Sequence, residues 1–346
     1  MRYFADPYEA WELAWARPDQ RLRPGVVQYR GYRLSLGKPR RRLEVPDGAV
    51  TLVLSFDGQL RTNDIGDTSG RRAERAPGEH RSSLLSALRT RATLGEHSGR
   101  MYGMEVTLTP WAAYTLFGVA MHEWAERIID PADLVGGRVN QLTEALACLP
   151  DWEQRFRLLD TTLGLWWEKG PAYSPRVVWA WRELLRTAGA VPIRRVSAQT
   201  GWGWRQCENR FLQQIGLPPK AVARIMRLHR ALRLLSEGNT ATLTALACSF
   251  SDQAHMSREI RRMTGFPPSR LLPARMPVAA NPLHDRIPGQ VTSFALPRSG
   301  RAGLCEILQD NTVTRPQGCV AEGAGATPAR QAITMHGNHR DKGEDQ

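Results

Sequence analysis

Two short segments of this sequence carry side chains whose hydrogen-bonding groups could recognise the edges of nucleic-acid bases. Arg presents forked donors that match guanine, and Gln and Asn pair a donor with an acceptor as adenine requires. In the first segment the candidate residues are Trp204, Arg205, Glu208 and Asn209. In the second they are Gln253, Ala254, His255, Arg258 and Arg262. If each segment is a helix that presents these positions outward, the residues predict contact with DNA bases in the major groove.

A repeated pattern surrounds these candidates and predicts the elements that position them. Each copy has a small residue, a turn residue and two apolar anchors four residues apart, which are Ser197, Gly201, Cys207 and Phe211 in the first copy and Ala245, Ser249, Met256 and Ile260 in the second. The offsets between equivalent positions are 48, 48, 49 and 49 residues, which indicates an internal repeat with one residue inserted after the second turn. A small contact residue, a tight turn and anchors on the second helix are what a helix-turn-helix needs. The anchors face inward, so the candidate residues face outward.

The ends of the second recognition helix and the segment between the copies also have recognisable signals. Ser251 is the expected N-cap and Gly265 the expected C-terminal stop. Pro218 and Pro219 open a helix that runs from Lys220 to Glu237 and stops before Gly238. Its inner side carries Val222, Ile225, Leu232 and Leu235, and its basic residues are Arg224, Arg227, Arg230 and Arg233. We expect a rigid spacer that separates two recognition helices by about one turn of DNA, ~10 bp.

The distribution of charge agrees with a polyanionic partner. The chain has a net charge of +13, and residues 191–275 hold 14 Lys and Arg against 4 Asp and Glu, a balance of +10. Basic residues that neutralise phosphates release counterions, so such a segment fits duplex DNA. The alternative is an ordinary solvated basic face with no binding role.

The run GWGWRQCENRFLQQIGLPPKAVARIMRLHRALRLL and the later run ALACSFSDQAHMSREIRRMTGFPPSRLL resemble the double helix-turn-helix domain of the AraC/XylS family. The resemblance covers about 85 residues and includes the SDQxHxxRxxRRxTGxxPSR stretch. It differs at Ser249, where the family prefers Gly, and at Met256 and Ile260, where Phe is usual. It implies seven helices, promoter binding, and an N-terminal half that senses a small-molecule effector or forms a homodimer. RNA polymerase is an implied partner if the protein is an activator.

The N-terminal half is expected to combine strands with helices. Residues 49–56 and 101–108 are rich in β-branched and aromatic residues, and Asp57-Gly58 is a strong turn pair. Apolar residues then recur at helical spacing, as in Phe156, Leu159, Leu163 and Trp166 and in Val177, Val178, Trp181 and Leu185. His122 and the pair Trp166-Trp167 are interpreted as core packing rather than a ligand site. The runs RRRLEVPDGAVTLVLSF and GMEVTLTPWAAYTLFGV resemble the companion region of some regulators in the same family.

The chain is therefore expected to be α+β with four regions. Residues 1–110 form a partly β sensory-type region, 111–190 a helical region, 191–275 the DNA-binding domain and 276–346 a polar tail expected to be disordered. His336 and His339 in that tail are interpreted as solvated rather than as metal ligands.

Other functions have less support in the sequence. A DNA-alkyl repair fusion would need a reactive thiol, and Cys148, among apolar neighbours in ALACLPDW, is expected to pack in a core instead. Signatures of common hydrolases, P-loops and dinucleotide-binding folds are absent from the sequence. We expect no enzyme activity, no cofactor and no metal, and the remaining alternative is a non-regulatory DNA-coating protein. With no CxxC pair, no signal peptide and no long apolar run, a cytoplasmic location without membrane association is expected.

Overall fold

A computed structural model describes residues 1–6, 11–65, 78–272 and 290–296. All of them belong to one compact unit, Met1–Thr312. The expected tail is mostly outside the described residues, as are His336 and His339.

The larger sheet has seven strands, all paired antiparallel. In order across the sheet they are β1 (Arg2–Asp6), β2 (Trp11–Ala16), β3 (Val26–Ser35), β10 (Arg100–Leu108), β5 (Val50–Asp57), β8 (Leu84–Ser86) and β11 (Ile128–Ile129). Both strands expected from the sequence, β5 and β10, lie next to each other, with Val53 opposite Glu105. The turn after β5 is confirmed, since Gly58 has φ +89°. Arg30 and Glu105 form an ion pair between β3 and β10, and both side chains are buried.

The smaller sheet has five strands. They are β12 (Ser293–Ala295), β4 (Arg40–Glu44), β9 (Thr93–His97), β6 (Leu60–Asp64) and β7 (Glu79–Arg81). Residues 276–346 were expected to be a disordered tail. This expectation is wrong for Ser293–Ala295, which form strand β12. It pairs antiparallel with β4, and Phe294 is fully buried. A short strand held by partners far along the chain leaves little local signal.

Helices cover the larger sheet and lead towards the C-terminal part. After the short 3-10 turn η1 (Gln20–Leu22), they are α2 (Pro110–Phe117), the 3-10 turn η2 (Met121–Glu123), α3 (Ala132–Val135), α4 (Arg138–Cys148), α5 (Trp152–Lys169) and α6 (Pro175–Arg186). Helix α5 lies against β3, where the ring of Phe156 stacks on Tyr29 and Asp160 accepts a 2.9 Å hydrogen bond from the Tyr29 hydroxyl. The expected stripe on α5 is confirmed, because all four of its residues are buried.

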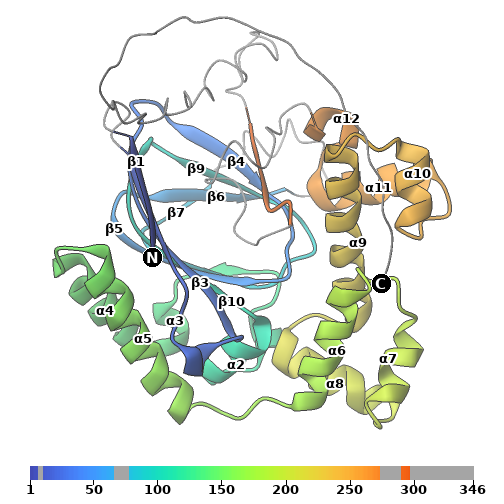
Figure 1. The fold of residues 1–346 in the computed structure, drawn as a ribbon, viewed down its shortest axis with the longest axis horizontal. Helices are drawn as coiled ribbons and strands as arrows, with labels where there is room; N and C mark the ends of the chain where they lie inside the picture. Colours follow the sequence, from blue (N-terminus) through green and yellow to red (C-terminus); the bar gives the residue numbers. More distant parts are fainter. Residues whose placement is uncertain (7–10, 66–77, 273–289, 297–346) are drawn as a thin grey trace, which may run out of the picture. The chain divides into compact units, whose positions relative to one another are not determined.

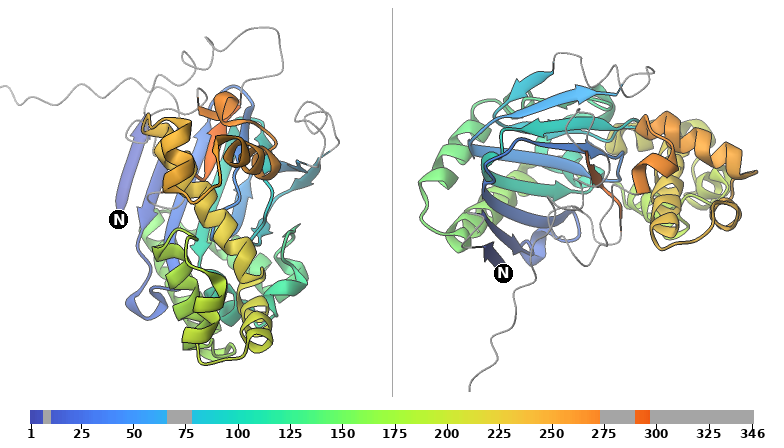
Figure 2. Two further views of the ribbon diagram at one scale, coloured as in Figure 1. Left: turned by 90° about the vertical axis from the view of Figure 1, so that its right-hand side faces the viewer. Right: turned by 90° about the horizontal axis from the view of Figure 1, so that it is seen from above.

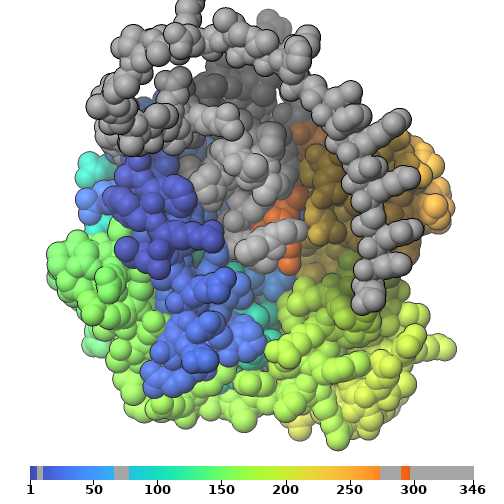
Figure 3. All heavy atoms as spheres, viewed as in Figure 1, coloured from blue at the N-terminus to red at the C-terminus, as the bar shows by residue number. Residues whose placement is uncertain are grey.

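The observed elements make the chain an α+β protein, as expected (Figure 1). Strand β11 comes after α2, so the sheet continues beyond the expected boundary at residue 110. Both views in Figure 2 place the helices from α6 onward on one side of the sheets. In the space-filling view these helices, coloured yellow-green to orange, form one side of the described surface, and the blue strands and green helices form the other (Figure 3).

Candidate nucleic-acid interface

The expected repeat is visible as two pairs of helices of matching length. Helices α7 (Ile193–Gln199) and α10 (Ala241–Ala247) have 7 residues each. Helices α8 (Trp204–Ile215) and α11 (Gln253–Thr264) have 12 residues each. The first pair starts 48 residues apart and the second 49, so the inserted residue lies in the second turn region. The two helix-turn-helix units predicted from spacing are therefore confirmed as elements.

Turn and anchor residues take the places that the sequence assigned to them. Gly201 has φ +69° and Ser249 has φ +58°, so both turns use the left-handed region. Of the small contact residues, Ser197 is 5% and Ala245 2% exposed. The anchors of both copies are buried, with Phe211, Met256 and Ile260 completely enclosed and Cys207 nearly so. Because the anchors occupy the inner face, the opposite face of each recognition helix is left at the surface.

The N-cap of α11 is Asp252, one residue later than the expected Ser251. A carboxylate oxygen of Asp252 accepts a 2.6 Å hydrogen bond from the backbone N–H of His255. This bond lowers the pKa of Asp252. The Ser251 hydroxyl instead contacts Asp252 at 3.2 Å and the His255 ring at 3.0 Å. The Gly265 stop is confirmed by its left-handed φ of +79°, and Gly216 ends α8 in the same way with φ +96°.

On α8 the four candidate residues lie along one side of the first recognition helix. Trp204, Arg205 and Asn209 are exposed, and Glu208 is half-buried. Trp204 leaves 44% of its surface exposed, which is unusual for so large an apolar ring. Gln206 and Arg210 are also exposed on the flank of the same helix. Sequence reasoning missed these two residues, although each immediately precedes an anchor and the helical period alone places them at the surface.

On α11 some of the candidate side chains contact neighbours in the same unit, and others are exposed. Gln253, Ala254, Arg258 and Arg262 are exposed. Gln253 receives a long 3.4 Å hydrogen bond from Thr242 of α10, and the ring of His255 meets Phe250 edge-on at 5.5 Å. Arg262 lies 3.8 Å from Glu259. The positions of Gln253 and His255 are thus fixed partly by neighbours in the same unit. Arg258 is exposed, and its charge contributes to the lowered pKa of Asp252.

The spacer helix α9 (Pro219–Ser236) begins and ends close to the expected positions, but it is enclosed more fully than expected. All four predicted inner residues are buried, and so are Ala223, Met226, Leu228, His229 and Ala231. Its basic residues also have structural contacts. Arg224 donates to Glu259 of α11 at 2.9–3.0 Å, and Arg227 lies over the Phe250 ring at 5.7 Å. The helix therefore holds the second unit directly rather than only separating the two units.

Residues of the N-terminal part also contact this helix and both recognition helices. His229 of α9 is hydrogen-bonded to the carbonyl of Pro46 at 2.8 Å. The backbone N–H of Ala92 donates to the carbonyl of Met263, near the end of α11, at 2.7 Å. Gly216, at the end of α8, lies so close to η2 that a Cβ there would be 3.0 Å from the carbonyl oxygen of Met121. Sequence reasoning missed these contacts because they join distant segments.

Two expectations about isolated residues are wrong. Cys148 is exposed, because the buried stripe of α4 runs through Val139, Leu142 and Leu146 and leaves the last residue of the helix outside it. His122 is also exposed, since η2 turns Met121 and Trp124 inward instead. Of the pair Trp166-Trp167, Trp166 is buried, and Trp167 is partly buried against the core with its ring near Trp111.

The described residues contain no group of three or more His, Cys, Asp or Glu side chains that could hold a metal ion. In the same part of the chain, every helix is too short or too polar to cross a membrane.

Comparison with family models matches residues 196–273 to the family described as a helix-turn-helix domain. Among solved structures, ToxT from Vibrio cholerae is similar over 70% of this chain and 97% of that chain, with 8% identity and a TM-score of 0.40. The C-terminal domain of AraT, a response regulator from Geobacillus stearothermophilus, is similar over 34% of this chain and 98% of that chain, with 16% identity and a TM-score of 0.29. Comparison with curated proteins found no match. The repeated helices and their buried anchors agree with the family match, and together they identify residues 196–273 as a helix-turn-helix DNA-binding domain.

Proposed function

We propose that this protein is a transcription regulator that binds specific promoter sequences in double-stranded DNA through both helix-turn-helix units. The observation that carries the proposal is the pair of recognition helices, each with a buried anchor face and an exposed polar face. Base contacts come from Trp204, Arg205, Glu208 and Asn209 of α8 and from Gln253, Ala254, His255, Arg258 and Arg262 of α11. Arg258 is the strongest candidate for a guanine contact, because its forked donors are exposed on the outer face of α11.

The remainder of the chain controls this activity in our proposal. The N-terminal part senses a small-molecule effector or forms a homodimer, and it is not catalytic. Its contacts with both recognition helices, through Met121 and Ala92, give a change in the N-terminal part a direct physical route to the DNA-binding surface. An effector acts only if it binds one arrangement of these contacts better than another. RNA polymerase is a partner if the protein activates transcription.

The test uses the full chain, because the buried contacts of α9 with the N-terminal part would be exposed in an isolated fragment. A duplex selected from a random library by the protein is titrated beside an unrelated duplex of equal length, at several salt concentrations. We expect the selected duplex to bind at least ~10³-fold more tightly, with an affinity that falls steeply as salt rises. Equal affinity for the two duplexes would indicate a DNA-coating protein, and salt-independent binding would contradict a phosphate-facing surface.

Sensing is tested separately by thermal unfolding of the full chain against a panel of small metabolites, and dimerisation by sedimentation. A compound that raises the unfolding temperature and also changes operator affinity would support the sensory role. A monomer that no compound stabilises would contradict this part of the proposal without affecting DNA binding.

A further inference from the structure

We infer that Glu126 is a positioning residue that holds the two recognition helices in a fixed relation to each other, a role that rests on DNA binding by both units. Glu126 lies outside both helix-turn-helix units. Glu126 joins two short segments of the N-terminal part. Each of these segments contacts the C-terminal end of one recognition helix. Three features support this role: the backbone conformation of Glu126, its hydrogen bonds with Thr90, and the contacts made by its neighbours in the chain.

The backbone of Glu126 is in a conformation that side chains other than Gly rarely adopt. Its φ is +62°, in the left-handed region. Such a residue is strained, and it persists only where surrounding contacts determine its conformation, often where a structure needs one particular geometry. The N–H of Glu126 donates to the carbonyl of Leu88 at 2.9 Å, and the N–H of Ala87 donates to the carbonyl of Arg127 at 3.2 Å. These bonds continue the pairing of β8 with β11 past the ends of both strands.

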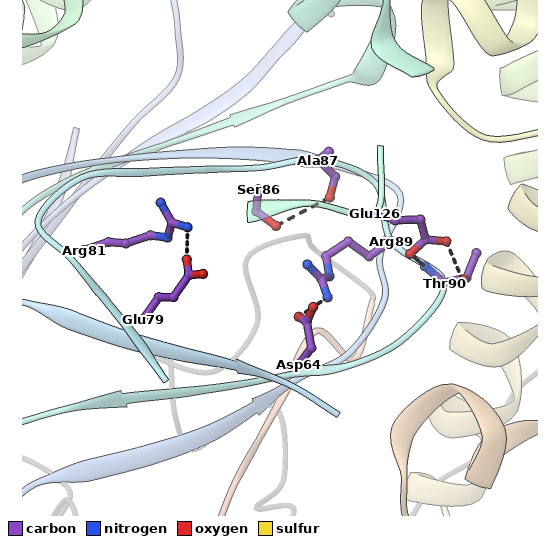
Figure 4. A network of polar contacts seen from close by, with 8 residues as sticks. All are labelled: Asp64, Glu79, Arg81, Ser86, Ala87, Arg89, Thr90 and Glu126. Carbon is purple, nitrogen blue, oxygen red and sulfur yellow. Dashed lines mark hydrogen bonds and ion pairs between the residues drawn. The ribbon is translucent and has the colours of Figure 1, made fainter. Parts of the chain in front are cut away.

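The carboxylate of Glu126 then completes this pairing. Its two oxygens accept hydrogen bonds from the backbone N–H of Thr90 at 2.8 Å and from the Thr90 hydroxyl at 2.5 Å. Beside this contact, Arg89 forms an ion pair with Asp64 at the end of β6 (Figure 4). The segment from Leu88 to Ala92 is therefore fixed at several points. Among the described residues, the side chain of Glu126 connects this segment to the residues that follow η2.

Each of the two segments joined by Glu126 supports one recognition helix at its C-terminal end. On the Thr90 side, Ala92 donates to the carbonyl of Met263, and Ala92 in turn accepts from Ile65 at 3.3 Å. Ile65 lies against Gly265, where a Cβ would come within 2.6 Å of its side chain. On the other side, η2 precedes Glu126 in the chain and packs against α8, with Met121 next to Gly216. Met121 and Trp124 are both about 1% exposed, so both side chains anchor this turn in the hydrophobic core.

The connection matters because a helix needs two points of support to have a fixed direction. The spacer helix gives α11 one point, through Arg224 and Glu259. The N-terminal part gives α11 a second point through Ala92 and Ile65, and it supports α8 through η2 and α2. Glu126 links the η2 support of α8 to the Ala92 support of α11. Without it, each recognition helix could tilt independently about its contact with the rest of its unit. The separation of the two DNA segments that the protein recognises would then be less strictly defined.

The experiment measures how strongly the protein prefers the correct spacing between its two DNA segments. The probes are a duplex selected by the wild-type full chain and the same duplex with one base pair inserted between the two protected segments. The variants are Glu126→Ala, Glu126→Gly, which also relieves the backbone strain, and Glu126→Gln, which retains an oxygen that can accept from Thr90. Glu123→Ala removes an exposed carboxylate from η2 and is the matched control.

We expect Glu126→Ala and Glu126→Gly to reduce the preference for the selected spacing roughly three- to tenfold. Glu126→Gln and Glu123→Ala should keep that preference, and affinity for unrelated DNA should stay the same in all four variants. A purely structural role would lower the unfolding temperature without changing the spacing ratio, and this result would overturn the inference. So would an equal loss in Glu126→Gln, or a wild-type protein that binds its selected duplex but tolerates the insertion.

Thr90→Val and Thr90→Ser give a second test if the Glu126 variants do not fold. The first removes the hydroxyl that donates to the carboxylate and the second retains it. Loss of spacing preference in Thr90→Val alone supports the inference, and no difference between the two contradicts it. If the wild-type protein shows no sequence preference at all, the proposed function itself fails, and this outcome is distinct from any change in spacing preference.

Discussion

Gly201 and Ser249 occupy equivalent turns of the two units with nearly the same backbone angle, φ +69° and +58°, although only one of them is Gly. A left-handed conformation costs a side-chain residue ~1–2 kcal/mol relative to Gly. Because a Cβ at Gly201 would meet nothing within 4 Å, the penalty there would come from the backbone alone. We expect Ser249→Gly to stabilise the protein by about 1 kcal/mol and Gly201→Ala to destabilise it by a similar amount. Urea unfolding of the full chain measures both, and destabilisation by Ser249→Gly would contradict this account.

The cap of the second recognition helix gives another matched pair. Asp252 accepts from the backbone N–H of His255, and Ser251 does not cap the helix. Asp252→Ala should cost ~1 kcal/mol of unfolding free energy, within the usual range for lost caps. Ser251→Ala should cost less, because its hydroxyl contacts only the side chains of Asp252 and His255 and no backbone N–H of the helix. Equal losses in the two variants would show that Ser251 contributes to the cap after all.

Base recognition by α11 can be separated from simple attraction between charges. Arg258→Ala and Arg233→Ala each remove one positive charge, but Arg258 lies on the exposed face of α11 and Arg233 on the spacer helix, 3.9 Å from Glu237. A base contact contributes ~1–3 kcal/mol of discrimination. Arg258→Ala should lower the ratio of affinities for the selected and unrelated duplexes, and Arg233→Ala should leave the ratio nearly unchanged. If both variants weaken binding to the two duplexes by the same factor at fixed salt, Arg258 contacts only the backbone.

Strand β12 should contribute to stability even though it follows the DNA-binding domain in the chain. Phe294 is fully enclosed, and replacing a buried Phe by Ala typically costs ~3–5 kcal/mol. Leu296 is only partly buried and is the control. We expect Phe294→Ala to lower the unfolding free energy by ~3 kcal/mol or more and Leu296→Ala to lower it much less. If the two variants unfold like the wild type, β12 does not stabilise the sheet in solution.

His97 at the end of β9 should make stability depend on pH. Burial, reinforced by the nearby charges of Arg42 and Arg40, lowers the pKa of His97 from 6.5 to about 4. Its Nδ1 also accepts a 3.2 Å hydrogen bond from the N–H of Gly99, which requires that nitrogen to be unprotonated. Between these pH values the unfolded chain binds more protons than the folded one, so stability is complete above pH 6.5 and declines towards pH 4.

The expected loss is roughly 1.4 kcal/mol for each unit of pKa difference, reduced by the partial exposure of the ring. Unfolding of the wild type and of His97→Gln at a series of pH values isolates this contribution from that of other groups. The variant should show a flatter dependence between pH 6.5 and 4, and parallel curves would exclude His97 as the cause.

Much of the DNA-binding domain followed from sequence because its determinants are local. The turn at Gly201, the anchors Cys207 and Phe211 and the stop at Gly265 act within one or two helical turns, so spacing alone predicted them. The repeat showed the same pattern of contact residue, turn and anchors a second time. The strands β5 and β10 were also recognisable, since β-branched and aromatic residues are concentrated in each of them.

Other features depended on contacts between segments far apart in the chain. No sequence pattern indicated that Ala92 would bond to Met263, that Gly216 would lie against Met121, or that β12 would return to β4. The bounds of the spacer helix were predictable. However, residues such as Leu228 and His229, outside the predicted inner face, are also buried. Periodicity and turn chemistry report on neighbours along the chain, and the free energy of these contacts arises only when the chain has brought distant residues together. The sequence by itself therefore determined what the recognition helices are, and the tertiary structure decided what holds them in place.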